Sequence, residues 1–310
     1  MKRIQYHQYG GPEVMRLEDF EPAPLGPDEV LVRVRAAAAN PMDFGIRAGA
    51  MKVVTGRGFP RAMGHDFAGI VEAVGDSTTR LQVGDEVLGG APIRSAGAFA
   101  DVVVAKENGV VTKPADLSFE DSAALPTPAI TALQALVKKG RLQRRQAVFV
   151  HSGLGAVGRA AAQIALARGA TVGGSCRATA EDEARELGID PVVGFDVDPV
   201  PLRGRFDLVI DTAGTLPVKT ARTMLKPGGH VVGIHPTPAN FVRSALPGPY
   251  HVLIARPVTD DLETVAAAAG RGTLRLPIAR TVALSEAIPA LTDVEHNRLD
   301  KRGKLIITPS

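Results

Sequence analysis

The sequence predicts an α/β protein built from two parts, a compact β-barrel-like domain and a doubly wound parallel sheet. Residues 1–120 hold short β-type runs cut by Gly and Pro, with almost no helical periodicity. Residues 146–168 then combine a short apolar run, a glycine-spaced turn and an Ala-rich helix. Strand and helix patterns continue to alternate after this unit, in the order that a parallel sheet covered by helices requires.

The β-barrel-like domain is expected to include both the N-terminal residues and the end of the chain. In the N-terminal part we expect four strands, over residues 30–37, 67–74, 86–88 and 98–104. The C-terminal part contains a helical stretch at 285–291 and an apolar strand at 304–308. We expect these two C-terminal elements to rejoin the N-terminal domain.

The strand, turn and helix of residues 146–168 predict a dinucleotide-binding unit. Residues 147–150 suit a central parallel strand, and residues 156–168 suit a helix. Between them lie Gly153, Gly155 and Gly158, at the spacing of a Rossmann turn. In such a turn the first glycine permits the bend, the second lets the backbone approach a pyrophosphate, and the third lets helix and strand pack closely. The helix N-terminus then receives the anion.

The end of the next strand, residues 170–175, indicates which dinucleotide is bound. It ends in Ser175, Cys176 and Arg177, and the next acidic residue is Glu181. An acid at this place binds the ribose of NAD, whereas a hydroxyl and a guanidinium can donate to the 2′-phosphate of NADP. The sequence therefore favours NADPH. The alternative is that Arg177 only faces solvent.

Further strands are expected at 205–211, 230–234 and 250–254. Residues 221–225 are expected to end a helix that residues 226–229 stop, and residues 260–269 form a further helical stretch. Ligands of an open α/β sheet lie across the carboxyl ends of its strands. We therefore expect one crevice to gather the residues that follow three of these strands, namely Ser175, Thr212 and the Ile234-His235 pair.

Several motifs together resemble the medium-chain dehydrogenase/reductase superfamily, and within it the zinc-free quinone oxidoreductases, which are similar to zeta-crystallin. They are Ala39-Asn40-Pro41-Met42-Asp43, Gly64-His65-Asp66-Phe67-Ala68-Gly69, Val83-Gly84-Asp85-Glu86-Val87, residues 117–136 and Arg302-Gly303-Lys304-Leu305. The resemblance implies a GroES-like catalytic domain over residues 1–122 and 262–310. It implies a Rossmann NADPH-binding domain over residues 123–261.

The same resemblance implies individual cofactor contacts. Thr131 matches a threonine beside the cofactor, and Ala156 and Val157 match backbone donors to the pyrophosphate. Phe195 stands where relatives often have a tyrosine near the adenosine phosphate, so Arg177 would carry more of that recognition. Two further cofactor contacts are expected at His235, where a small residue is common, and at Lys304 of the terminal motif.

The motifs identify the catalytic residues less clearly than the cofactor contacts. The resemblance places Asn40 near the nicotinamide, where its amide could polarise the acceptor carbonyl, or it is only a turn residue before Pro41. His65 could supply a proton, or it is a relic of a metal-binding ancestor. Asp43 and Arg47 could form an i,i+4 pair on a short helix.

The cysteine count argues against zinc. The chain has one cysteine, Cys176, so neither a four-cysteine site nor the usual Cys/His/Cys catalytic set can be assembled. His65 and Asp66 could be two ligands, but a third is hard to name. A single cysteine also excludes intramolecular disulfides and fits a reducing cytoplasm.

Composition is that of a globular enzyme. The chain has 310 residues, of which 45% are hydrophobic, and a net charge of +3, which gives no basis for nucleic-acid binding. No apolar run approaches the length of a membrane span, and no signal peptide is recognised. We expect a cytoplasmic homodimer that reduces quinones or α,β-unsaturated carbonyls with NADPH. The alternatives are a non-catalytic NADPH-binding protein and, more distantly, an alcohol dehydrogenase.

Overall fold

The computed structural model describes residues 1–56, 58–296 and 303–309, and it divides into two compact units. The first unit is Met1–Thr127 with Pro257–Ser310, and the second is Pro128–Arg256. The boundaries expected from the sequence, 122/123 and 261/262, fall inside helices α3 (Phe119–Ala123) and α9 (Thr259–Gly270). Both helices belong wholly to the first unit, because α3 packs on β3 (Glu29–Ala38) and α9 packs on β8 (Val110–Thr112). Arg302 of the terminal motif lies outside the described residues.

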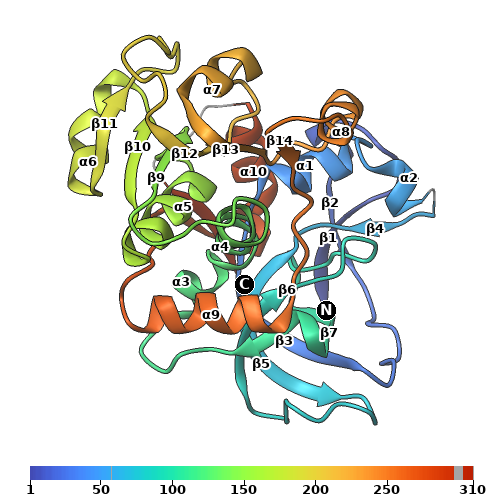
Figure 1. Cartoon of the computed structure of the whole chain (residues 1–310). Helices are drawn as coiled ribbons and strands as arrows, with labels where there is room; N and C mark the ends of the chain where they lie inside the picture. Colours follow the sequence, from blue (N-terminus) through green and yellow to red (C-terminus); the bar gives the residue numbers. More distant parts are fainter. Residues whose placement is uncertain (57, 297–302, 310) are drawn as a thin grey trace. The chain divides into compact units, whose positions relative to one another are not determined.

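The first unit is built on a seven-stranded sheet and a three-stranded sheet (Figure 1). The larger sheet has the order β15-β16-β3-β5-β6-β8, and β7 also pairs with β3. The smaller sheet has the order β2-β1-β4. Besides β3 and β8, the strands are β1 (Lys2–Tyr6), β2 (Arg16–Asp19), β4 (Arg61–Ala62), β5 (Asp66–Val74), β6 (Glu86–Gly90), β7 (Val102–Lys106), β15 (Ile278–Ala283) and β16 (Lys304–Thr308).

Buried and exposed side chains alternate along β3, so one face of this strand packs on the core. Its Val30, Val32 and Val34 are buried, whereas Arg33 and Arg35 between and beyond them are exposed. This is the period of two that places one face of a strand on a core. The antiparallel pairing of β16 with β3 brings the end of the chain back to the N-terminal domain, as the sequence predicted.

Short helices join the strands of the first unit. They are η1 (Pro12–Val14), α1 (Pro41–Arg47), α2 (Lys52–Thr55), η2 (Glu107–Gly109), η5 (Leu284–Glu286) and α10 (Ala287–Glu295), besides α3 and α9. Helix α4 (Pro126–Leu133) crosses the boundary between the units.

The second unit is a six-stranded parallel sheet with the order β11-β10-β9-β12-β13-β14. Apolar residues of the central strands, such as Phe149 and Phe206, form its core with their rings edge to face. The strands are β9 (Ala147–His151), β10 (Thr171–Ser175), β11 (Ile189–Val193), β12 (Phe206–Asp211), β13 (Leu225–Gly233) and β14 (Tyr250–Val252). The helices are η3 (Gln134–Lys139), α5 (Ala156–Ala167), η4 (Ala178–Ala180), α6 (Glu181–Glu186), α7 (Val218–Met224) and α8 (Pro238–Ala245).

The predicted α/β class, with a GroES-like part and a Rossmann-type parallel sheet, is confirmed, but several elements differ. The strand expected at 98–104 is β7, at Val102–Lys106, because Ala98 and Phe99 turn away to bond to Gly64 and Met63. The helix expected to end at 221–225 is α7, which ends at Met224, and residues 226–229, which were expected only to stop it, already belong to β13. No helix of the described residues is long and apolar enough to cross a membrane.

Candidate functional site

The glycine turn of the second unit joins β9 to α5. A Cβ atom on Gly158 would lie 2.1 Å from the carbonyl oxygen of Ser152, so only glycine lets the helix start this close to the strand end. The first N–H groups of α5, those of Ala156 and Val157, have no acceptor within the helix. The turn therefore presents free backbone donors at a positive helix end, which suits a phosphate group.

A hydrogen-bonded layer supports this turn from the neighbouring strand ends. The N–H of Gly153 donates to the carbonyl of Ser175 at 2.8 Å, and the N–H of Ser152 donates to Ser175 Oγ at 3.0 Å. Ser175 Oγ also lies 2.7 Å from Nδ1 of His151, the last residue of β9. Since Ser175 is buried and its hydroxyl already has these partners, its role is to stabilise the turn, and its hydroxyl does not face a ligand.

The next strand end is held by Asp211 and Thr212. The hydroxyl of Thr212 donates to the carbonyl of His151 at 2.7 Å. The Asp211 carboxylate accepts from the backbone N–H groups of Ala213, Gly214 and Leu216, which shapes the loop after β12. These bonds place the loop at the carboxyl ends of the parallel strands, where the sequence predicted a crevice.

The remaining predicted cofactor residues of the second unit, except Thr131, follow the ends of these strands. The Ile234 N–H donates to the carbonyl of Asp211, and the His235 ring packs against Gly214. The ring of Phe195, which is 44% exposed, meets the ring of His151 edge to face at 5.5 Å. Arg177 is exposed, and its guanidinium has no hydrogen bond or ion pair within the described part of the chain. Thr131 lies in α4.

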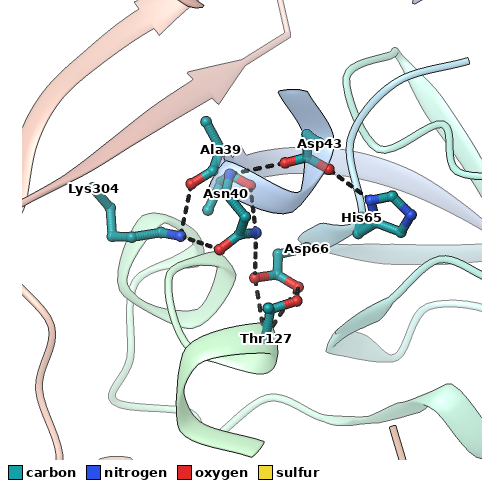
Figure 2. A network of polar contacts seen from close by, with 8 residues as sticks. Ala39, Asn40, Asp43, His65, Asp66, Thr127 and Lys304 are labelled. Carbon is teal, nitrogen blue, oxygen red and sulfur yellow. Dashed lines mark hydrogen bonds and ion pairs between the residues drawn. The ribbon is translucent and has the colours of Figure 1, made fainter. Parts of the chain in front are cut away.

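A polar network occupies the first unit, formed by the half-buried Thr127 and by five buried residues, Asn40, Asp43, His65, Asp66 and Lys304 (Figure 2). Lys304 Nζ donates to the carbonyl of Ala39 at 2.7 Å and to Asn40 Oδ1 at 2.6 Å. Asn40 Nδ2 donates to Asp66 Oδ2 at 2.9 Å. Lys304 is therefore bound to Asn40 at the start of α1, and its backbone belongs to the first unit.

Asp66 is held from two sides. Its carboxylate accepts from the backbone N–H of Thr127 at 3.1 Å and from the Thr127 hydroxyl at 2.6 Å, besides the bond from Asn40. Burial raises the pKa of Asp66, while the charge of Lys304 and the bonds from Thr127 and Asn40 partly offset the rise. Burial likewise lowers the pKa of Lys304, and the charges of Asp66 and Asp43 oppose that change.

Asp43 links the network to His65. One carboxylate oxygen accepts from the backbone N–H of Asn40 at 2.8 Å, and the other lies 2.6 Å from His65 Nδ1. Burial alone would lower the pKa of His65, but the hydrogen bond to Asp43 and the charges of Asp43 and Asp66 outweigh it, so the pKa lies above its usual value. The other ring nitrogen, Nε2, is buried, and a hydrogen bond to the Ile93 backbone also raises the pKa of His65.

These contacts change two expectations. Asn40 Nδ2 is already bonded to Asp66 and to the carbonyl of Ala38, so both of its N–H groups have acceptors and neither is free for a carbonyl substrate. The predicted pair between Asp43 and Arg47 does not form. The buried guanidinium of Arg47 binds Glu295 on α10 at 2.7 and 2.9 Å, because Asp43 turns inward to His65.

Sequence reasoning missed Thr127, His151 and Asp211 as parts of the two sites. His151 and Asp211 carried a usable signal, since each is a polar residue that ends an apolar central strand. Thr127 carried none, because its role depends on a contact with Asp66 across 61 residues of sequence.

Comparisons with known proteins agree with this architecture. Residues 26–115 match the alcohol dehydrogenase GroES-like domain, and residues 187–307 match the zinc-binding dehydrogenase family. A quinone oxidoreductase from Pseudomonas aeruginosa is 30% identical, with 99% of each chain covered. A 2-methylene-furan-3-one reductase from Solanum lycopersicum is 34% identical over 75% of this chain and 61% of that protein. The quinone oxidoreductase structure from Coxiella burnetii has a TM-score of 0.90 at 28% identity and covers 100% of this chain and 99% of that chain.

A GroES-like part, a six-stranded Rossmann-type sheet and a glycine turn at its strand ends define a medium-chain dehydrogenase/reductase. The chain belongs to this superfamily, in its quinone oxidoreductase branch. It is therefore an oxidoreductase by family.

The residues of the polar network do not fit the zinc that the name of the second matching family implies. His65 Nδ1 is bonded to Asp43, both oxygens of Asp66 have partners, and the Lys304 ammonium lies 2.6 Å from Asn40 Oδ1. A divalent cation would have to share this buried space with an ammonium group, and no thiolate is present to help hold it. Among the described residues, no group of three or more His, Cys, Asp or Glu could hold a metal ion.

Proposed function

We propose that this protein uses NADPH to reduce quinones or α,β-unsaturated carbonyls without zinc. The observation that carries the proposal is the glycine turn at the end of β9, whose close packing only Gly158 permits, together with Arg177 shortly after β10, which is exposed and has no ion pair among the described residues. When bound, the nicotinamide supplies a hydride. The names of the relatives, a quinone oxidoreductase and a 2-methylene-furan-3-one reductase, support the class of acceptor.

Preference for NADPH rests on Arg177 in this proposal. Ser175 was expected to share the task, but its hydroxyl is bonded to Ser152 and His151. A guanidinium forms short, charge-assisted hydrogen bonds to phosphate, and Arg177 has no competing partner among the described residues. We assign the other dinucleotide contacts to Gly153, Gly155, Ala156, Val157, Phe195, Thr212, Ile234, His235 and Thr131.

The first unit supplies the proton in this proposal. The hydrogen bond between Nδ1 and the Asp43 carboxylate fixes the orientation of the His65 ring, and the raised pKa favours the protonated ring more than in a free imidazole. We therefore propose His65 as the proton donor, through Nε2. Asn40 is a positioning residue that joins Lys304 to Asp66, and Lys304 acts within the same network rather than on the cofactor.

Binding and turnover measurements test the proposal. Calorimetry should show NADPH binding at least about tenfold tighter than NADH, which corresponds to roughly 1.4 kcal/mol. R177A should remove most of that preference while leaving NADH affinity nearly unchanged. Equal affinity for the two dinucleotides in the unmodified protein would remove the NADPH assignment.

Turnover with a benzoquinone and with a simple enone identifies the reaction class. NADPH oxidation should depend on the acceptor and should be unaffected by a strong chelator, with no stoichiometric zinc in elemental analysis. Tight NADPH binding without turnover of either acceptor would instead favour the non-catalytic alternative. Loss of activity on chelation would overturn the zinc-free mechanism.

We also propose that the protein is a homodimer and works in a reducing cytoplasm. Strand β14 is the last strand of the second unit's sheet, and an unpaired edge strand favours association. Phe241, Val242 and Leu246, in and just after α8, are exposed apolar side chains beside this edge.

The proposed reducing compartment rests on the cysteine. The single cysteine is buried and free, as suits such a compartment.

A further inference from the structure

The first turn of α6 is acidic although it closely follows Arg177. Glu181, Asp182 and Glu183 begin this helix, four to six residues after Arg177. Negative side chains near a bound 2′-phosphate weaken its binding by repulsion, so an NADPH site should not tolerate them uncompensated. The structure shows an ion pair for each of the three acids, although two of them share one arginine.

Two arginines pair with these three acids. Arg185 binds Glu181 at 2.8 Å and Asp182 at 3.3 Å on the same exposed helix surface. Glu183 is paired differently, with the guanidinium of Arg159 on α5. The Arg159 side chain is only 9% exposed, so this pair is better shielded from solvent than the other two.

Arg159 also contacts the glycine turn itself. Its Nε donates to the carbonyl of Leu154, between Gly153 and Gly155, at 3.0 Å. One planar guanidinium thus connects the pyrophosphate-binding turn to the helix that follows Arg177. Few other side chains could make both contacts, since a lysine has no fixed pair of donor directions.

The charge of Glu183 acts at the end of β10. Burial raises the pKa of the Cys176 thiol most, the charges of Glu181 and Glu183 raise it further, and the charge of Arg185 lowers it. Cys176 directly precedes Arg177, and its thiol donates to the Arg177 carbonyl at 3.3 Å. An unpaired Glu183 would therefore act on the segment that we propose binds the phosphate.

We infer that Arg159 is a positioning residue for cofactor choice, which neutralises Glu183 and so allows Arg177 to select the phosphorylated dinucleotide. The inference rests on the proposed function, because it presupposes that Arg177 binds the 2′-phosphate. Arg159 itself acts through Glu183 and the Leu154 carbonyl.

Dissociation constants for NADPH and NADH, measured by calorimetry at low and high salt, test the inference. In R159M the exposed charge of Glu183 should weaken NADPH about tenfold and NADH about threefold, so that the NADPH preference falls about threefold at low salt. The fall should shrink at high salt because screening removes a charge effect but not a packing defect. The R159M/E183Q double variant should regain the preference without regaining full affinity.

The matched control is R159M/E186Q, which removes an equal charge from the exposed Glu186 of the same helix. It should not restore the preference, because Glu186 does not pair with Arg159. If R159M fails to fold, R159K and E183Q replace it: R159K should keep the preference within about twofold, and E183Q should raise it more than E186Q does.

The outcomes separate the two proposals. An unmodified protein without preference for NADPH overturns the proposed cofactor, and the inference with it. A clear preference that R159M or E183Q leaves unchanged overturns the inference alone. Equal restoration by E183Q and E186Q also overturns it, since a general reduction of negative charge would then suffice.

Discussion

At the residue scale, Lys304 is the side chain on which the polar network of the first unit depends. It is the only ammonium in the network, and it supplies hydrogen bonds to Asn40 Oδ1 and to the Ala39 carbonyl. It also lies in the field of two buried carboxylates, Asp43 and Asp66. A buried carboxylate without a compensating cation is strongly destabilising, so the network is sensitive to loss of this one charge.

K304M should therefore lower the free energy of unfolding by about 3 kcal/mol, because it leaves two buried acceptors and a carboxylate uncompensated. Urea denaturation with global fitting measures the loss. The control is K106M, whose ammonium pairs with Asp28 at the surface and should matter far less. Equal effects of K304M and K106M would show that the network does not need its cation.

The raised pKa of His65 predicts a pH dependence of stability. A group whose folded pKa lies above its unfolded value of about 6.5 stabilises the fold fully below pH 6.5, and this stabilisation is lost as pH rises through the folded pKa. The difference in unfolding free energy between the unmodified protein and H65Q should thus decrease from slightly acidic to alkaline pH. Denaturation at a series of pH values measures it, and a difference that grows with pH would contradict the assignment.

At the element scale, the strand, turn and helix of the second unit depend on close backbone approach. Gly158 lies against the Ser152 carbonyl, while Ser175 and His151 hold the turn from the adjacent strand ends. These bonds fix the helix end before any ligand binds, so little ordering is needed on binding.

G158A should weaken NADPH binding by at least about tenfold, because its new Cβ forces the helix end away from the strand. Calorimetry measures the affinity, and circular dichroism checks the fold. G194A is the matched control, since a Cβ on Gly194 would meet no atom within 4 Å. Similar affinities for the two variants would exclude the turn as the pyrophosphate site.

At the scale of the whole molecule, the exposed apolar residues of the second unit bear on the proposed homodimer. Val242 is 64% and Leu246 is 61% exposed, next to the last strand of the sheet. Exposed apolar side chains that gather beside a free strand edge are typical of an interface between copies.

The unmodified protein should therefore have a dimer mass in light scattering at micromolar concentration, and the V242D/L246D variant should have a monomer mass. A charge buried in an apolar interface costs more than the association can offset. V200D is the control, because Val200 is 66% exposed in the same unit and lies between β11 and β12 rather than in α8 or β14. A monomer mass for the unmodified protein would remove the homodimer from the proposal.

The order of elements around the glycine turn could be predicted from the sequence alone. Residues 147–150 and 156–168 lie close to the observed β9 and α5, because hydrophobic periodicity and glycine spacing act over a few neighbouring residues. The terminal strand at 304–308 was predicted for the same reason. Boundaries in the β-type part were predicted less well, since strands such as β7 are fixed by partners distant in sequence.

The sequence by itself determined the fold class, the superfamily and the glycine turn between β9 and α5, because each is encoded in local patterns. Only the tertiary structure decided which polar side chains share a buried space. Lys304 meets Asn40 across 264 residues, and Arg159 meets Glu183 from a different helix. Burial compels such groups to find partners wherever the fold brings them, and no local pattern records which partner that is.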